Sequence, residues 1–433
     1  MDGNSIEKID QALSAEYSRY WGFENSEGSS LAQTRALLRQ ADTFHQARSA
    51  VIYALFVPRD QAKGLNAADF GSAQSARLAL NRRLQNAAIG DSDQLLLVLV
   101  PSAGPPVQQQ LEVTRQEVLQ QAKLFRMAVS DPEDDISYRP LAQQMYQWLF
   151  APVEPDVQRL QLDNVMYVVD PGLRTVPLAA MMNDDRFIVE RYGLSIIPSV
   201  NLLQTSFGDP PPPPQTVAAG ADQFMQQENL PAVSLELAAI ADSQKSTQVL
   251  LNEAFTQTNL ATVRAQSQAA MLHLATHAEF NAGDLPSSYL QFWDSQLTFD
   301  QIREMGWEDL ELLILSACAT AISSPEAELG FAGLAAATGV ESSIGSLWNV
   351  SDVGTLALMA EFYGHWSQTP LRFDALRRSQ LSLLQGDTQI ANQSLLTARG
   401  QIKLPAEWNL PESADFRHPF YWSGFTLVGN PWW

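Results

Sequence analysis

The sequence predicts an α/β protein with a parallel or mixed sheet that is covered by helices on both faces. Two observations support this class. Short apolar runs of strand length, such as Ser49–Val57 and Gln94–Val100, recur along the chain. Between them lie longer segments, such as Val353–Trp366, in which apolar residues return every three or four positions. Because strands that alternate with helices are typical of crossover connections, we expect two related sheets or one continuous sheet.

The first half of the chain is expected to begin with a helical segment and to continue as an α/β body. Residues 1–44 are polar, with Ile6, Ile9, Leu13 and Tyr17 spaced for one face of an amphipathic helix. Residues 45–207 form the body. Its expected strands are Ser49–Val57, Gln94–Val100, Asn164–Asp170 and Phe187–Val200, and its expected helices are Val107–Val129 and Leu141–Phe150.

A run of five prolines, Pro210–Pro214, marks the clearest boundary in the chain. Proline cannot donate to a sheet ladder or continue a helix, so residues 208–215 are expected to form a stiff linker. Residues 216–433 then repeat the α/β pattern. The expected strands are Thr216–Asp222, Gln248–Asn252, Ala269–Phe280, Asp309–Ala321, Ser342–Trp348 and Tyr421–Asn430, and the expected helices are Val233–Gln244, Phe255–Gln266, Glu328–Gly339, Val353–Trp366 and Phe373–Leu384.

Composition narrows the function classes. The chain has 433 residues, with 27 Lys and Arg against 48 Asp and Glu, a formal net charge of −21. This charge repels nucleic acid and anionic membranes and favours basic protein segments as partners. The one cysteine, Cys318, excludes a disulfide within the chain and a cysteine-based zinc site. With no leader-like N-terminus and no apolar run of membrane-spanning length, we expect a soluble, cytoplasmic protein.

Two reactive side chains stand at the ends of strongly apolar predicted strands. His277 follows the run MLHLAT and Cys318 follows the run LLILSA. Ligands and catalytic groups of α/β sheets collect at the carboxyl ends of strands. A cysteine becomes a nucleophile when a neighbouring histidine or a helix N-terminus ionises its thiol. The pair therefore indicates nucleophilic catalysis.

Other roles are open for the same residues. A cysteine in an apolar strand can be a small buried hydrophobe. His273 and His277 form an H-x-x-x-H pattern, which on a helix would place both rings on one face as metal ligands. The flanking sequence favours a strand, however, and no Glu follows His273 as the metalloprotease pattern requires. His273 is more simply interpreted as a core residue or a support for its neighbours.

Several segments resemble the CHAT family, in particular its cyanobacterial type. HLATHAEF (His273–Phe280) and LLILSACAT (Leu312–Thr320) are similar to the two active-site motifs of that family. Further matches follow in the family's order at Glu328–Asp352, Leu358–Trp366 and His418–Trp432, and Asn164–Met182 resembles its amino-terminal portion. The family is similar to separases, caspases and gingipains, which implies a caspase-like, three-layer α/β fold in which residues 45–207 form a pseudo-caspase half and residues 216–433 the active half.

The resemblance also implies roles for individual residues. His277 would be the general base and Cys318 the nucleophile, with the backbone amides of Cys318 and Ala278 binding the oxyanion. Family members usually have Gly at the position of Ala278, which matters if that position needs a positive φ. Asp352, with Asp222 as a second candidate, would bind a basic substrate side chain. Alternatively, Asp352 is the N-cap of the helix that follows it.

We therefore expect a cysteine endopeptidase that cleaves proteins after Arg or Lys. The pattern implies no cofactor and no metal, and a regulatory protein acting in trans is a further expectation. The competing hypothesis is a CHAT-like scaffold without turnover that binds other proteins. Metal-dependent hydrolysis through His273 and His277 is a third possibility, and it predicts sensitivity to chelators.

Overall fold

The computed structural model describes residues 3–21, 28–58, 89–203, 215–224, 227–279, 285–319, 338–369 and 371–432, with side chains except at residues 3–5, 20–21, 303 and 317–319. The chain divides into two compact units, Met1–Ala128 with Ile136–Asp209, and Val129–Asp135 with Pro210–Trp433. The predicted linker 208–215 lies outside the described residues except for Gln215. The predicted helix 328–339 lies outside them except for its last two positions.

The first unit is built around one mixed sheet with the strand order β7-β4-β1-β2-β3. Strands β7, β4 and β1 are parallel, whereas β2 is antiparallel to both β1 and β3. The strands are β1 (Ser49–Val57), β2 (Gln94–Pro101), β3 (Val107–Thr114), β4 (Asn164–Val169) and β7 (Gly193–Ile196), with a separate hairpin of β5 (Met182–Asn183) and β6 (Arg186–Phe187). Every residue of β1, β2 and β4 is buried, as expected of strands that are covered on both faces.

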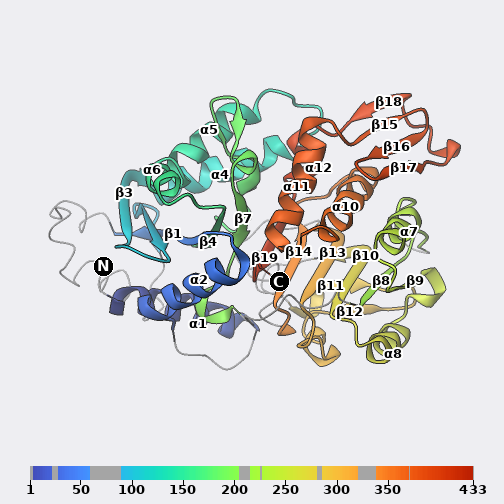
Figure 1. Cartoon of the computed structure of the whole chain (residues 1–433), viewed down its shortest axis with the longest axis horizontal. Helices are drawn as coiled ribbons and strands as arrows, with labels where there is room; N and C mark the ends of the chain where they lie inside the picture. Colours follow the sequence, from blue (N-terminus) through green and yellow to red (C-terminus); the bar gives the residue numbers. More distant parts are fainter. Residues whose placement is uncertain are drawn as a thin grey trace. The chain divides into compact units, whose positions relative to one another are not determined.

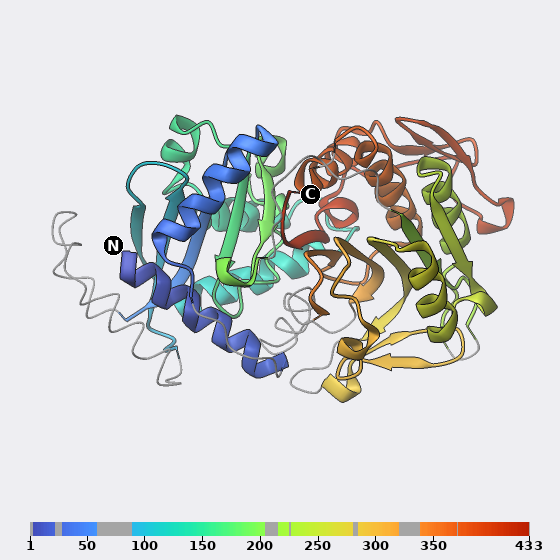
Figure 2. The same cartoon turned by 60° about the horizontal axis from the view of Figure 1, so that its bottom comes forward.

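Helices cover both faces of this sheet. In Figures 1 and 2, α1 (Gly3–Trp21) and α2 (Leu31–His45) lie on one side of the strands. On the other side lie α4 (Arg115–Val129), α5 (Tyr138–Leu149) and α6 (Glu154–Arg159), and single turns of 3₁₀ helix occur at η3 (Leu178–Ala180), η4 (Ile188–Glu190) and η5 (Val200–Leu202). The apolar stripe predicted for the first segment is buried.

The prediction of one long helix over Val107–Val129 is wrong. Its first eight residues form β3, which pairs with β2, and the helix α4 begins only at Arg115. Thr114 ends the strand and caps the helix: its hydroxyl accepts from the Glu117 amide at 3.3 Å, and the Thr114 amide donates to the Glu117 carboxylate at 2.8 Å. The strand predicted over Phe187–Val200 likewise shortens to β7, with a 3₁₀ turn before it.

The second unit contains the sheet that carries the candidate site. Along it the strand order is β12-β11-β10-β13-β14-β19, and β10 also pairs with β8, which pairs with β9. The bounds are β8 (Thr216–Gly220), β9 (Thr247–Leu251), β10 (Met271–Glu279), β11 (Tyr289–Gln291), β12 (Gln296–Thr298), β13 (Leu312–Ala319), β14 (Ser342–Ser346) and β19 (Phe425–Gly429). The parallel strands β9, β8, β10, β13 and β14 were each predicted from apolar runs, and all are confirmed.

The crossovers of the second unit place helices on both faces of its sheet. The chain runs from β8 through α7 (Val233–Ser243) to β9, and returns from β9 through α8 (Gln257–Ser267) to β10 on the other side of β8. Both crossovers are expected to be right-handed. Because they run in opposite directions across the sheet, α7 and α8 lie on opposite faces. Helix α10 (Asp352–Trp366) packs against α7 and α11 (Arg372–Gln385), and α12 (Pro419–Trp422) precedes the last strand.

A small antiparallel sheet between α11 and α12 was not predicted. Its order is β17-β16-β15-β18, formed by β15 (Gln389–Ala391), β16 (Ser394–Thr397), β17 (Gly400–Lys403) and β18 (Ser413–Asp415), with η9 (Ala406–Trp408) between β17 and β18. The remaining 3₁₀ turns are η6 (Asn252–Ala254), η7 (Leu285–Ser287) and η8 (Ile302–Met305). Among the described residues, no helix combines the length and apolar character needed to cross a membrane.

Candidate active site

The register of two neighbouring strands places His277 beside Cys318. Strands β10 and β13 are parallel, and the pairs along them include His277 with Cys318 and Ala278 with Ala319. Adjacent strands lie about 4.8 Å apart, so the two backbones meet at the same level of the sheet. Both residues stand at the carboxyl ends of their strands, where α/β sheets collect functional groups. The side chain of Cys318 lies outside the described part of the chain.

The imidazole of His277 is held by the loop that follows β8. Its Nε2 lies 2.8 Å from the carbonyl oxygen of Glu228, and the Phe224 ring packs on it at 4.7 Å between centroids. A carbonyl oxygen only accepts hydrogen bonds, so Nε2 carries the proton when the ring is neutral. Nδ1 is then the nitrogen with a free lone pair. This orientation could not be predicted, because the partner is a backbone atom that any residue would supply.

His273 is a core residue of the same strand. It is completely buried, with Nε2 at 2.9 Å from Glu236 Oε1 and Nδ1 at 3.2 Å from the Tyr363 hydroxyl. Four residues of strand separate it from His277, a distance of about 13 Å, which is too long for one ion to join both rings. The H-x-x-x-H pattern therefore lies on a strand and does not form a helical metal motif.

Ala278 fits its position without strain. It lies within β10 and pairs with Leu290 of β11 as well as with Ala319. The residues other than glycine that have positive φ among those described do not include Ala278. An extended backbone accepts alanine as readily as glycine, so the departure from the family's usual Gly imposes no conformational penalty here.

His277 and Ala278 line a cleft of about 970 Å³. Its described lining contains three carboxylates, from Glu228, Glu279 and Asp352, and no Lys or Arg. The rest of the wall is polar or apolar: Gln227, Asn229, Leu230, Pro231, Tyr289, Asn349, Val350, Ser351, Val353, Trp408 and Leu410. A cleft of this charge favours a cationic ligand.

Asp352 is half-buried at the start of α10, on the wall of this cleft. One of its oxygens, Oδ2, accepts from the Ala232 amide at the start of α7 at 2.8 Å. The alternative prediction, that Asp352 is the N-cap of its helix, is wrong: Ser351 is the N-cap and accepts from the Gly354 amide at 3.2 Å. Asp352 is the first helical residue, so its second oxygen is not required for capping.

The environment of Asp352 favours its neutral form. Burial, and then the negative charges of Glu236 and Asp222, raise its pKa from 3.8 to about 6, against the opposing effect of the Ala232 amide. A cation bound in the cleft would favour the ionised form of Asp352, because it would offset the negative charges of these neighbours. Perturbed carboxylates in clefts are frequently functional groups, for this reason.

Asp222 lies two residues beyond the end of β8 and is not among the described residues that line the cleft. Its Oδ1 accepts from Asn252 Nδ2 at 2.9 Å, and its amide donates to Asn252 Oδ1 at 3.0 Å. The structure therefore brings His277, Ala278 and Asp352 to one cleft and places the backbone of Cys318 beside that of His277, while the charge of Asp222 acts on Asp352 from outside the described lining.

Residues 139–430 match the family described as the CHAT domain. The chain belongs to this family. The CHAT family consists of caspase-like cysteine peptidases and their relatives, and the caspase-like α/β fold predicted from the sequence is confirmed with it. No curated protein matches the chain.

Solved structures of low similarity include two peptidases. The separase of the Saccharomyces cerevisiae separase–securin complex aligns with a TM-score of 0.48 at 9% identity, over 99% of this chain and 32% of the separase chain. The complex of the Porphyromonas gingivalis RgpB pro- and mature domains aligns with a TM-score of 0.40 at 9% identity, over 72% of this chain and 76% of that chain. The chain thus spans about a third of the separase that it matches.

Proposed function

We propose that this CHAT protein is a cysteine endopeptidase that cleaves protein substrates after Arg or Lys, with Cys318 as nucleophile and His277 as general base. The observation that carries the proposal is the strand register that pairs Cys318 with His277, which lines an acidic cleft. Family membership supports the reaction class, and the cleft supports the choice of substrate.

In this mechanism, Nδ1 of His277 removes the thiol proton of Cys318, and the thiolate attacks the carbonyl carbon of the scissile peptide bond. The imidazolium then gives its proton to the leaving amine, which departs and leaves an acyl-thioester on Cys318. Water, deprotonated by His277, hydrolyses the thioester and restores the thiol. Throughout, the Glu228 carbonyl accepts from Nε2–H, which holds the ring in place and stabilises its cationic form.

The tetrahedral intermediates need hydrogen-bond donors for their oxyanion. We assign this role to the backbone amides of Cys318 and Ala278, by the resemblance to the family. Donors that are fixed before the reaction stabilise the developing charge without reorganising, which makes them a large contribution to catalysis. The unstrained extended backbone at Ala278 supports its competence in this role.

Selectivity for a basic side chain would come from Asp352. Its Oδ1 is left for a ligand, because Oδ2 accepts from Ala232 and Ser351 performs the capping. A guanidinium or ammonium group bound there forms a charge-assisted hydrogen bond that a neutral side chain cannot form. Asp222 would strengthen the site through its charge.

The test compares hydrolysis of matched fluorogenic peptides that carry either Arg or citrulline before the scissile bond. The wild-type chain should cleave the Arg peptide, and Cys318→Ala and His277→Ala should each lower kcat by about a thousandfold or more, because members of a dyad act as a unit. Chelator should leave the rate unchanged. Equal hydrolysis by wild type and Cys318→Ala would contradict the peptidase hypothesis and favour the hypothesis of a protein-binding scaffold.

A regulatory protein that acts in trans is a separate proposal. An acidic cleft open to any basic segment needs control, and a bound protein could supply it by covering the cleft. Copurification from the native host should recover a second protein whose addition changes the rate with the Arg peptide. Recovery of the chain alone, with full activity, would contradict it.

A further inference from the structure

The small sheet β15–β18 supplies a second, apolar wall to the cleft. Trp408, at the end of η9, and Leu410, two residues later, line the same cleft as His277 and Asp352. Both side chains are half-buried. They belong to a connection between α11 and α12 that takes no part in the proposed chemistry, so their presence in the cleft needs a separate explanation.

The loop that carries Trp408 is fixed to its sheet at both ends. The Leu404 amide donates to the Gln393 carbonyl at 2.9 Å before the loop, and the Asn392 amide donates to the Glu412 carbonyl at 3.1 Å after it. Within the loop, the Trp408 amide donates to Pro405 O at 3.2 Å. The indole is therefore presented by an ordered turn, a property expected of a binding surface.

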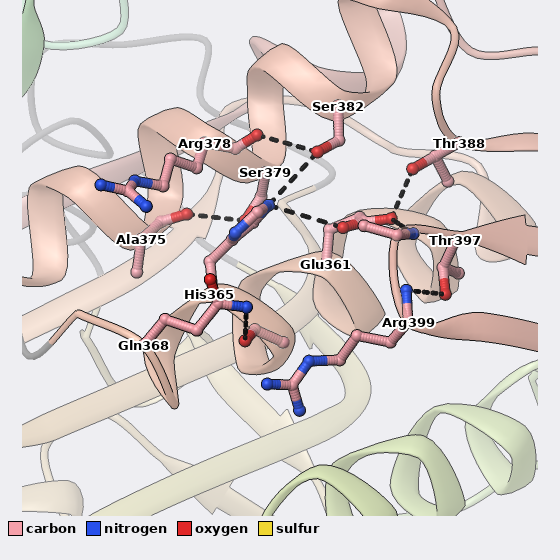
Figure 3. A network of polar contacts seen from close by, with 12 residues as sticks. Glu361, His365, Gln368, Ala375, Arg378, Ser379, Ser382, Thr388, Thr397 and Arg399 are labelled. Atoms are coloured by element: carbon pink, nitrogen blue, oxygen red, sulfur yellow. Dashed lines mark hydrogen bonds and ion pairs between the residues drawn. The ribbon is translucent and has the colours of Figure 1, made fainter.

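A buried carboxylate ties this sheet to the body of the second unit. Glu361, on α10, is 1% exposed, and its Oε1 accepts from the Thr388 hydroxyl at 2.6 Å and from the Ala398 amide at 2.8 Å, on either side of β15 and β16 (Figure 3). His365, one turn later on the helix, lies 3.5 Å from the other oxygen. Since α10 begins with Asp352, one helix positions both the acidic group and the apolar wall.

The cleft is larger than a single basic side chain requires. Its volume of about 970 Å³ lies at the upper end of the range, roughly 300–1,000 Å³, of pockets that bury drug-sized ligands. Its carboxylates complement one cation, whereas the indole of Trp408 and the side chain of Leu410 complement an apolar group. Two kinds of wall in one cleft indicate two neighbouring substrate side chains of different chemistry.

We infer that Trp408 and Leu410 form a second subsite, which selects a bulky apolar or aromatic residue within one or two positions of the basic residue in the substrate. This inference rests on the proposed peptidase function and deepens it by naming the substrate class. The preferred substrate is a protein segment that combines one cation with an adjacent aromatic or large aliphatic side chain.

The kinetic test uses Arg peptides that differ only at the neighbouring positions, with Phe, Leu or Gly. Wild type should prefer Phe or Leu to Gly by about tenfold or more in kcat/KM, the discrimination expected of an apolar pocket. Trp408→Ala should abolish this preference by lowering kcat/KM for the Phe and Leu peptides to the level of the Gly peptide, whereas Trp408→Phe should keep most of it. Trp293→Ala, which alters a half-buried indole outside the described lining of the cleft, is the matched control.

A binding experiment separates failure of this inference from failure of the proposed function. With Cys318→Ala, which cannot form the acyl-enzyme, calorimetry should show tighter binding of the Arg-Phe peptide than of the Arg-Gly peptide, and Trp408→Ala in that background should remove the difference. Equal affinities for the two peptides, or a preference that survives both Trp408→Ala and Leu410→Ser, would overturn the subsite. If the peptides bind with this preference but wild type does not hydrolyse them, only the proposed peptidase function is overturned and the subsite stands.

Discussion

Asp352 meets two opposing demands, because the group that would bind a cation is also partly buried beside other carboxylates. Its raised pKa means that the folded chain holds the proton more tightly than the unfolded chain. Between pH 3.8 and about 6 the folded state therefore binds more protons, and the free energy of unfolding decreases as the pH rises through this window. Above about pH 6, the ionised carboxylate lowers the free energy of unfolding by a constant amount.

Asp352→Asn should separate the functional from the structural role of this residue. Asn keeps an oxygen for the Ala232 amide and removes the buried charge, so the free energy of unfolding at pH 8 should stay equal to that of wild type or rise by about 1 kcal/mol. At pH 4 the difference should vanish. Over the same change, kcat/KM for the Arg peptide should fall by about a hundredfold, and that for the citrulline peptide should hardly change.

Chemical denaturation at both pH values, combined with the two peptides, checks this prediction. The matched control is Asp222→Asn, which should reduce the preference for Arg by less, because Asp222 is outside the described lining of the cleft. An Asp352→Asn chain that is destabilised at pH 8 and equally active on Arg would show that the carboxylate serves only to join α7 to α10.

Ionisation of Asp352 also predicts a pH dependence of activity. The rate with the Arg peptide should increase as the pH rises through about 6, because only the carboxylate form binds the guanidinium strongly. Asp352→Asn should lose this inflection at low pH while any inflection from the dyad stays. A wild-type profile with the same shape for Arg and citrulline peptides would contradict the assignment.

At the scale of single residues, the sequence could indicate the candidate nucleophile and base, because two apolar runs end at His277 and Cys318 and the segments around them resemble known motifs. It could not indicate that the Glu228 carbonyl holds the imidazole, since a backbone oxygen has no sequence signature. It also could not choose between the roles of Asp352. Ser351 and Asp352 are both good N-caps, and only the position where α10 begins decides between them.

Among the elements, the sheet β15–β18 depends on one buried carboxylate. Glu361→Ala would leave the Thr388 hydroxyl and the Ala398 amide without their charged acceptor, so it should lower the free energy of unfolding by about 3 kcal/mol. Hydrogen exchange should accelerate in β16 and β17. The preference for an apolar neighbour in the substrate should weaken, because the loop with Trp408 is no longer held.

Glu412→Ala is the control for this variant, since it removes an exposed carboxylate next to β18 of the same sheet. Urea unfolding, hydrogen exchange and the paired Arg-Phe and Arg-Gly peptides are the measurements. A Glu361→Ala chain with unchanged exchange in β16 and β17 would contradict the view that this contact fixes the sheet.

Strands buried on both faces could be predicted, whereas the edge strand β3 and the small sheet β15–β18 could not. Strands β1, β4, β10 and β13 have continuous apolar runs that match their position in the middle of a sheet. Strand β3 is an edge strand with three consecutive glutamines and a glutamate, and its apolar residues recur at helical spacing, so that pairing with β2 decides its conformation. The capping pair Thr114 and Glu117 is the sequence signal for the boundary between β3 and α4, because it marks where the helix begins. Strands β15–β18 are short and half-polar, so the sequence contains no apolar run that would predict them.

For the whole molecule, the net charge of −21 should attract basic substrates before they reach the cleft. The Debye length falls from about 10 Å at 0.1 M salt to about 3 Å at 1 M. Peptides with one and with three positive charges should therefore both lose kcat/KM as salt is added, the second about three to ten times more steeply. Equal salt dependence for the two would show that only the local carboxylates act.

The candidate site belongs to one of the two compact units of the chain. All described residues that line the cleft belong to the second unit. The sequence agrees with this division, because no His or Cys ends a predicted strand of the first half. That the first half supports the second as a pseudo-caspase body stays a prediction.

The central claim is that Cys318, activated by His277, forms a covalent acyl-enzyme with a basic substrate. Intact-mass measurement after treatment with an Arg-containing acyloxymethyl ketone tests it most directly, because Cys318 is the one cysteine in the chain. The thiolate displaces the carboxylate of the inhibitor and forms a thioether, so wild type should gain the mass of one peptidyl methyl ketone group. Cys318→Ala should gain none, and His277→Ala should react far more slowly. Equal labelling of wild type and Cys318→Ala, or a wild type that cleaves Arg peptides but is never labelled, would contradict the account.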